Sequence, residues 1–291
     1  MAENIKIQLS DIYEPVTEDD IRKGKNFVLR RESASRGLAS LANALLADAA
    51  AKITQICYKY GVEPTSFQIS YQYNEAMMEE IGKVMDELEE EILDLTMDYS
   101  ARCTQDKEKK NALILWVLTL GKGNKALKAS LEDRLRMFLK DVEAMIVAAN
   151  VAKFDVTKAV TIIKSNLHTV YQMPGMQAAF GNASLYKAEY IRSRGVKAGY
   201  RGNSNSEANN IDRFVRMTVQ MAWMHYHQQL YEEQGAVGYY VLRGSTYPCE
   251  LCQSKVSFHD ISDKDSFPPQ HYHCVCFTVP VYEKDINELT I

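Results

Sequence analysis

The stretch IGKVMDELEEEILDLTMDYS, residues 81–100, decides the fold class, because its apolar residues recur every three or four positions. These apolar positions are Ile81, Val84, Leu88, Ile92, Leu95 and Tyr99. Such spacing marks one face of an α-helix, and acidic residues fill the opposite face. We interpret the acidic face as a solvated surface; a docking face for a basic partner is the alternative. The stretch therefore predicts a long amphipathic helix.

The same period continues on both sides of this stretch. It predicts further helices over 36–60, 112–120, 127–149, 156–170 and 207–234. Asp155 is suited to cap the fourth of these, and Gly235 closes the last. The run ALILWVLTL, residues 112–120, is about half the length that a membrane-spanning helix needs, so we expect a buried helix there.

The period changes beyond Gly235. GYYVLRGS, residues 238–245, and CVCFTVPVY, residues 274–282, are rich in β-branched and aromatic residues and predict strands. Five glycines interrupt residues 172–206. We therefore predict a mainly α protein with three parts, a long helical body, an irregular basic and aromatic connector, and a long helix followed by a small α+β module stapled by metal. The parts are 1–171, 172–206 and 207–291.

Composition narrows the function classes. The 291 residues are 46% hydrophobic and 25% charged, as in soluble globular proteins. The formal net charge of −4 excludes a molecule that coats nucleic acid or an anionic membrane over its whole surface. The start of the chain lacks the basic and apolar pattern of a secretory signal, and no membrane partner is expected. We expect folding in a reducing cytoplasm, where clustered cysteines are metal ligands or redox groups rather than disulfides.

One segment of the connector is locally basic. It reads YKAEYIRSRGVKAGYR and interleaves tyrosines with lysines and arginines. Its candidate contact residues are Tyr186, Lys187, Tyr190, Arg192, Arg194, Lys197, Tyr200 and Arg201. Such a mixture suits phosphate contact with base stacking, or contact with a protein partner. A solvated loop is the other interpretation.

The sequence PCELCQSKVSFHDISDKDSFPPQHYHCVC, residues 248–276, holds four of the six cysteines and three of the six histidines. Cys249 and Cys252 form a C-x-x-C pair, and His271, Cys274 and Cys276 follow a loop. Two such pairs supply the four tetrahedral ligands of one structural zinc ion. All four cysteines make one complete set, and His271 in place of Cys274 or Cys276 makes another. The sequence leaves this choice open.

Other chemistries for this region differ in how well they fit. A thioredoxin-like redox pair needs its C-x-x-C at a helix start in a βαβ unit, and the surrounding sequence indicates neither. A zinc deaminase needs an upstream H-x-E or C-x-E, which the chain lacks. An HNH-like zinc-knuckle nuclease acting on DNA remains the alternative, since His259, His271 and His273 could supply a base and metal ligands. Against it, the adjacent Asp-His or His-His pair and a strong basic patch are missing.

The same residues carry a resemblance to a known family. C-x-x-C, a polar loop and FPPQHYHCVC resemble the C-terminal signature of phage minor head proteins of the Mu F-like, or head morphogenesis, family. The matching positions are Cys249, Cys252, Pro268, Pro269, His271, Cys274 and Cys276. Tyr272 and Val275 stand where the family favours proline and arginine. The resemblance covers about residues 160–282 and includes the helix that carries Arg216 and Thr218.

The resemblance implies a structural function rather than an enzyme. A protein of this family associates with the phage portal and the inner capsid during head assembly, and assists DNA packaging or delivery. We therefore expect a virion protein, inside the head or at the portal, assembled in the bacterial host cytoplasm. Its partners are portal and capsid proteins, with phage DNA contacted through the local basic segment. Its cofactor is one structural zinc ion.

Overall fold

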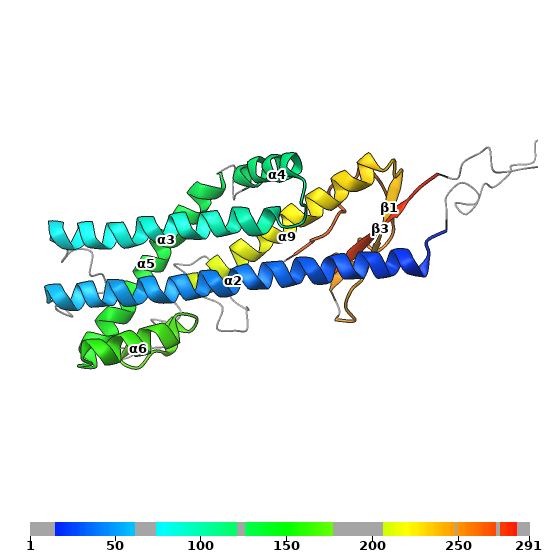
Figure 1. Cartoon of the computed structure of the whole chain (residues 1–291). Helices are drawn as coiled ribbons and strands as arrows, with labels where there is room; N and C mark the ends of the chain where they lie inside the picture. The colour runs from blue at the N-terminus through cyan, green and yellow to red at the C-terminus, as the bar shows by residue number, and fades with distance from the viewer. Residues whose placement is uncertain are drawn as a thin grey trace, which may run out of the picture. The chain divides into compact units, whose positions relative to one another are not determined.

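The computed structural model describes residues 15–61, 74–120, 126–176, 206–247, 249–271 and 274–283. Long helices make up most of this part of the chain, and a small sheet lies near its C-terminal end (Figure 1). The fold class predicted from the sequence is confirmed: the protein is mainly helical, with a small β-containing module that carries the cysteine and histidine cluster.

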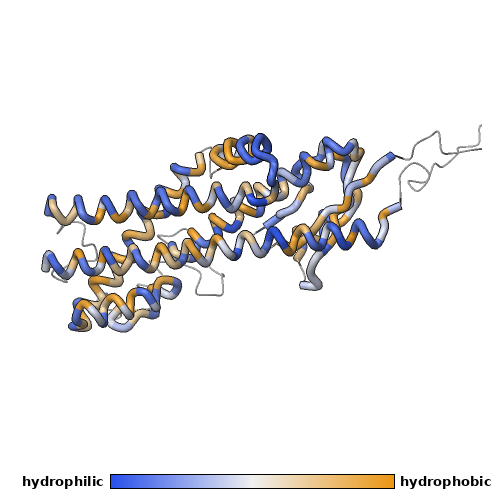
Figure 2. Tube along the Cα trace, in the orientation of Figure 1, coloured by the Kyte–Doolittle hydropathy of each residue, from blue (hydrophilic) through white to orange (hydrophobic). Residues whose placement is uncertain are grey.

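The elements follow the apolar periodicity, which Figure 2 displays as hydrophobic positions recurring along each helix. The long helices are α2 (Glu18–Tyr60), α3 (Glu75–Ala101), α4 (Lys107–Thr119), α5 (Leu127–Val151), α6 (Val156–Asn166) and α9 (Glu207–Glu233). The short helices are η2 (Val170–Gln172) and α10 (Glu250–Gln253), and the strands are β1 (Gly238–Leu242), β2 (Phe258–Asp260) and β3 (Phe277–Val281).

Helix α2 begins at Glu18, well before the start predicted at residue 36. A capping box explains this start. The Thr17 hydroxyl accepts a hydrogen bond from the backbone N–H of Asp20 at 3.2 Å, and the Asp20 carboxylate accepts one from the N–H of Thr17 at 3.0 Å. Acidic residues in the first turn also favour a helix here, because they face the positive end of the helix dipole.

Two other helix ends agree with the sequence. The Asp155 carboxylate accepts a hydrogen bond from the N–H of Lys158 at 2.9 Å, and so caps α6. Gly235 follows α9 with φ +77°, a conformation that glycine adopts without strain. Asp155 thus sets the start of α6, and Gly235 sets the end of α9, the helix that leads into the small module.

Helix α4 covers the longest apolar run, and it is buried on one side only. Leu113 and Val117 are buried, whereas Leu115 is 67% exposed. The expectation of a buried helix therefore holds for part of its surface. Within the described residues, we find no helix whose length and apolar character would let it cross a membrane.

The chain divides into two compact units. The first contains described residues from Met1–Arg36, Tyr99–Ile114 and Arg216–Ile291, and the second from Gly37–Asp98 and Leu115–Val215. The consecutive division predicted from the sequence, 1–171, 172–206 and 207–291, groups the chain differently and stays a prediction. In the second unit, Leu46 and Ile53 of α2, Ile92 of α3, and Phe138 and Met145 of α5 are fully buried.

The first unit contains the sheet, an antiparallel arrangement in the order β2-β1-β3. In its register, Tyr239 of the central strand lies opposite His259 on one side and Pro280 on the other. Helix α2 approaches β3 very closely at Gly24, where a Cβ atom would lie 2.8 Å from the carbonyl oxygen of Thr278. Only glycine fits that approach.

Hydrophobic clusters of two sizes lie among the described residues of this unit. The smaller contains Val28, Phe277 and Val279. The larger contains Met224, Tyr231, Ala236, Tyr239, Val241, Cys252, Phe267, Cys274 and Cys276. Three of the four C-terminal cysteines are therefore members of a hydrophobic core, and Cys249 packs against it.

Candidate metal centre

The C-x-x-C pair lies on a single helical turn. Cys249 has extended backbone angles at the N-terminal end of α10, and Cys252 lies within that helix. The expectation that no helix starts at the C-x-x-C is therefore wrong, whereas the sheet around it in the described residues is antiparallel and forms no βαβ unit. The N–H of Gln253 donates to the carbonyl of Cys249 at 2.9 Å and closes the turn. Residues three apart on a helix share a face, so the two sulfur atoms lie on the same side.

The second half of the cluster comes from the chain before β3. The N–H of Cys274 donates to the carbonyl of His271 at 3.0 Å, which forms a tight turn between these two residues. The sequence predicted a strand over 274–282, but β3 begins only at Phe277. That part of the prediction is wrong, because Cys274 turns back toward His271 and its side chain is buried in the cluster.

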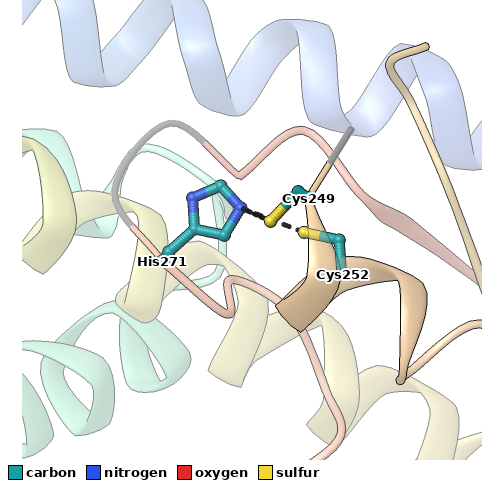
Figure 3. Close-up of side chains that lie close together, drawn as sticks. All are labelled: Cys249, Cys252 and His271. Carbon is teal, nitrogen blue, oxygen red and sulfur yellow. Dashed lines mark hydrogen bonds between the residues drawn. The ribbon is translucent and has the colours of Figure 1, made fainter. Parts of the chain in front are cut away.

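Figure 3 displays how His271 points between the sulfur atoms of the C-x-x-C pair. The His271 Nε2 atom lies 3.2 Å from Cys249 Sγ and 3.0 Å from Cys252 Sγ. Cys252 Sγ lies 3.8 Å from Cys274 Sγ. The donor atoms thus form two overlapping groups, Cys249 with Cys252 and His271, and Cys252 with Cys274 and Cys276, each within 4.8 Å.

This arrangement could bind a metal ion. Tetrahedral zinc bonds to sulfur and imidazole nitrogen imply separations of about 3.8 Å between two sulfur ligands and about 3.6 Å between sulfur and nitrogen. The distance between Cys252 and Cys274 agrees with the first value, and those to His271 are somewhat shorter than the second. Cys252 belongs to both groups and is the centre of the cluster.

Proton sharing dominates the ionisation of the buried thiols. A hydrogen bond between the side chains of Cys274 and Cys276 lowers the pKa of Cys274 and raises that of Cys276. Burial raises the pKa of Cys252, and the neighbouring Cys274 thiolate acts in the same direction. The N–H of Cys252 lowers the pKa of Cys249. A divalent cation can displace the shared protons, so metal binding is coupled to proton release.

A residue that sequence reasoning missed also touches the cluster. Arg31 of α2 is fully buried, and its Nη2 donates to the carbonyl of Cys274. The two residues are 243 positions apart. No local pattern in the sequence predicts this contact. An arginine on the apolar side of an amphipathic helix indicates only that its side chain has a buried partner, without naming that partner.

His259 belongs to a separate hydrogen-bonded group in the module. Its Nδ1 lies 3.0 Å from the Asp263 carboxylate, and its Nε2 lies 2.9 Å from both the Ser257 hydroxyl and the Lys255 carbonyl. The Nε2 atom is thus shared between the Ser257 hydroxyl and the Lys255 carbonyl. His259 is held by these contacts and belongs to neither donor group of the cluster.

The remaining predicted contact residues lie outside the described part of the chain. This applies to His273 and to the whole basic and aromatic segment, namely Tyr186, Lys187, Tyr190, Arg192, Arg194, Lys197, Tyr200 and Arg201. The structure therefore brings together Cys249, Cys252, His271, Cys274 and Cys276.

Comparison with known proteins identifies no relative: the chain matches no protein-family model, no curated protein and no solved structure.

Proposed function

We propose that the protein is a structural component of a phage head, of the minor-head type, whose C-terminal module is closed by one structural zinc ion. The observation that carries the proposal is a coincidence of two residue sets. Cys249, Cys252, His271, Cys274 and Cys276 give the sequence its resemblance to the minor-head signature, and the same five residues form the donor cluster. The signature then has a physical purpose, which is to staple the module.

Zinc is the metal that this donor set suits best. Thiolate and imidazole ligands in a tetrahedral arrangement favour zinc over harder cations such as magnesium and calcium. The donors are numerous enough to fill all four positions, which leaves no open position for a substrate or a water. A closed site of this kind stabilises a fold and does no chemistry.

The small module needs such a staple. Its three strands are between three and five residues long, and sheets this small are marginally stable without further support. A zinc ion bound by α10 and by the chain before β3 would connect two segments of the module that are distant in the sequence. Metal binding free energy would then appear as folding free energy.

The nuclease alternative is less well supported than the structural function. A nuclease would use His271 as a base or as a ligand of a catalytic metal, with access to DNA. Instead, its Nε2 lies within 3.2 Å of two sulfur atoms of the cluster. His259 is equally engaged, by Asp263 and by the Lys255 carbonyl.

In this proposal, portal and capsid proteins are the partners, and phage DNA is contacted through the basic segment of the connector. Sedimentation of producer-cell lysate through a density gradient tests it, with quantitative mass spectrometry of each fraction. The proposal expects the chain to co-migrate with capsid-sized particles at low copy number. A chain that stays at the top of the gradient while particles form would contradict it.

Two alanine variants distinguish a loss of incorporation into particles from a loss of total protein. Cys252→Ala removes the donor shared by both groups, whereas Cys57→Ala removes another buried thiol that lies outside the cluster. We expect the first variant to be depleted from particles relative to total protein. The second variant should be incorporated like the wild type.

A further inference from the structure

Arg31 is buried in an unusual state for an arginine. Its side chain has 0% exposure, and one terminal nitrogen makes its contacts: Nη2 donates to the carbonyl of Cys274 and lies 3.3 Å from the Glu32 carboxylate. Its Nε and Nη1 atoms have no hydrogen-bond partner among the described residues. Buried guanidinium groups are costly unless a nearby negative charge compensates them.

Glu32 compensates this charge only in part. The same Glu32 oxygen accepts a hydrogen bond from the Gln220 amide at 2.7 Å, and the other oxygen lies 4.0 Å from Arg36. The contact between Glu32 and Arg31 is weaker than the one between Glu32 and Gln220, because its two atoms lie 3.3 Å apart. A further source of negative charge is therefore expected near the guanidinium.

The cysteine cluster lies next to Arg31. The Nη2 atom of Arg31 donates to the backbone carbonyl of Cys274, and Cys276 follows two residues later in the same cluster. Both cysteines are buried in a cluster of apolar side chains, where charges interact strongly because water is excluded.

Zinc chemistry supplies the missing negative charge. A zinc ion with three thiolates and one imidazole carries one excess negative charge, and with four thiolates it carries two. A nearby cation stabilises such an anionic centre in an apolar core, and residues around the ligands tune metal affinity by charge and by hydrogen bonds. Arg31 offers both, through its fixed charge and its bond to the Cys274 carbonyl.

We propose that Arg31 is the positioning residue of the metal centre, which balances its negative charge and holds Cys274 in place from helix α2. This inference rests on the proposed zinc site and adds a residue outside the signature to it. It also makes the N-terminal part of α2 a component of the centre. Metal binding and the packing of residues 18–36 onto the module are then linked.

The test is zinc affinity of the full-length chain, measured under reducing conditions by competition with a chromogenic chelator. Arg31→Met removes the charge and keeps most of the side-chain length, and Arg31→Lys keeps the charge. Arg36→Met is the matched control, since Arg36 lies on the same helix and near the same Glu32 but is 69% exposed. We expect Arg31→Met to bind zinc about 10-fold to 100-fold more weakly, with most of the loss restored in Arg31→Lys.

The outcomes separate the two proposals. Wild type that binds no zinc overturns the metal site and this inference together. Wild type that binds zinc, with Arg31→Met binding equally well, overturns this inference alone. A packing role would lower the stability of the metal-free and zinc-loaded chains equally, leave zinc affinity unchanged and gain nothing from lysine. If Arg31→Met does not fold, Arg31→Gln replaces it, and Arg31→Lys binding no better than Arg31→Gln refutes the role of charge.

Discussion

Removing the sulfur of Cys252 should abolish a metal-dependent part of the stability of the first unit. Cys252 is 4% exposed and is the only cysteine in both donor groups. Cys57 is 0% exposed and lies outside the cluster; burial raises the pKa of its thiol to about 12, so it stays a neutral, inert thiol. Alanine at either position deletes one buried sulfur, and Cys57→Ala therefore controls for the loss of packing.

The two variants should differ in whether their loss of unfolding free energy depends on zinc. Loss of one buried sulfur costs about 1 kcal/mol of unfolding free energy at either position, by analogy with small core truncations. Free zinc at about 1,000 times its dissociation constant stabilises the wild type by about 4 kcal/mol. Cys252→Ala should therefore lose about 5 kcal/mol in zinc and about 1 kcal/mol in chelator, whereas Cys57→Ala loses about 1 kcal/mol in both.

The two tryptophans allow the assay to follow each unit. Trp116 belongs to the second unit, which contains Cys57, and Trp223 belongs to the first, which contains Cys252. Trp223 is 3% exposed and donates to the carbonyl of Tyr99 at 3.0 Å. Fluorescence during denaturant unfolding reports the first unit in a Trp116→Phe background and the second unit in a Trp223→Phe background. Equal losses for the two cysteine variants, with no effect of zinc on either, would refute the reasoning.

Three other predictions follow from particular contacts. Burial lowers the pKa of His227 to about 3, whereas the value in unfolded chains is about 6.5. The unfolded state therefore binds more protons, and the free energy of unfolding decreases as the pH drops below about 6.5. Between pH 7 and pH 5, wild type should lose about 2 kcal/mol more than His227→Phe at fixed free zinc, and identical pH profiles would contradict this. Gly244→Ala should lower the free energy of unfolding by about 1–3 kcal/mol, because its Cβ would lie 1.9 Å from the carbonyl oxygen of Val275. Gly82→Ala is the control and should not destabilise the protein, since there is open space around its Cβ. Equal effects of the two variants in thermal melts would show that the contact at Gly244 is not tight. Incubation of plasmid DNA with the protein and magnesium, manganese or zinc should give no cleavage on gels, and cleavage that disappears in His271→Ala would establish the nuclease alternative.

Helix positions could be predicted from the sequence because the signal is local and repeated. The apolar spacing of residues 81–100 gave a helix that the structure extends to Glu75–Ala101, and Asp155 and Gly235 mark helix ends as predicted. The N-terminal part of α2 was missed, because its residues are mostly polar and only a few of them, such as Val28, contact the module. The capping pair Thr17 and Asp20 was the available signal.

The site was predictable in its residues but not in its surroundings. Cysteine and histidine spacing indicated a metal cluster, since ligand spacing reflects the coordination geometry itself. Arg31 and the three-residue strand β2 depend on contacts between distant parts of the chain, which one sequence does not encode in a local pattern. The end of the predicted strand at Cys274 failed for the same reason, because the turn to His271 overrides β propensity.

The metal content of the purified chain shows directly whether the cysteine and histidine cluster holds zinc. The full-length chain would be purified with reductant and without added metal, and its mass and zinc content would be measured by native mass spectrometry and elemental analysis. The account predicts one zinc ion per chain in the wild type, and its loss in Cys252→Ala but not in Cys57→Ala. A folded chain with reduced thiols that contains no metal, and takes up none when titrated with zinc, would contradict it.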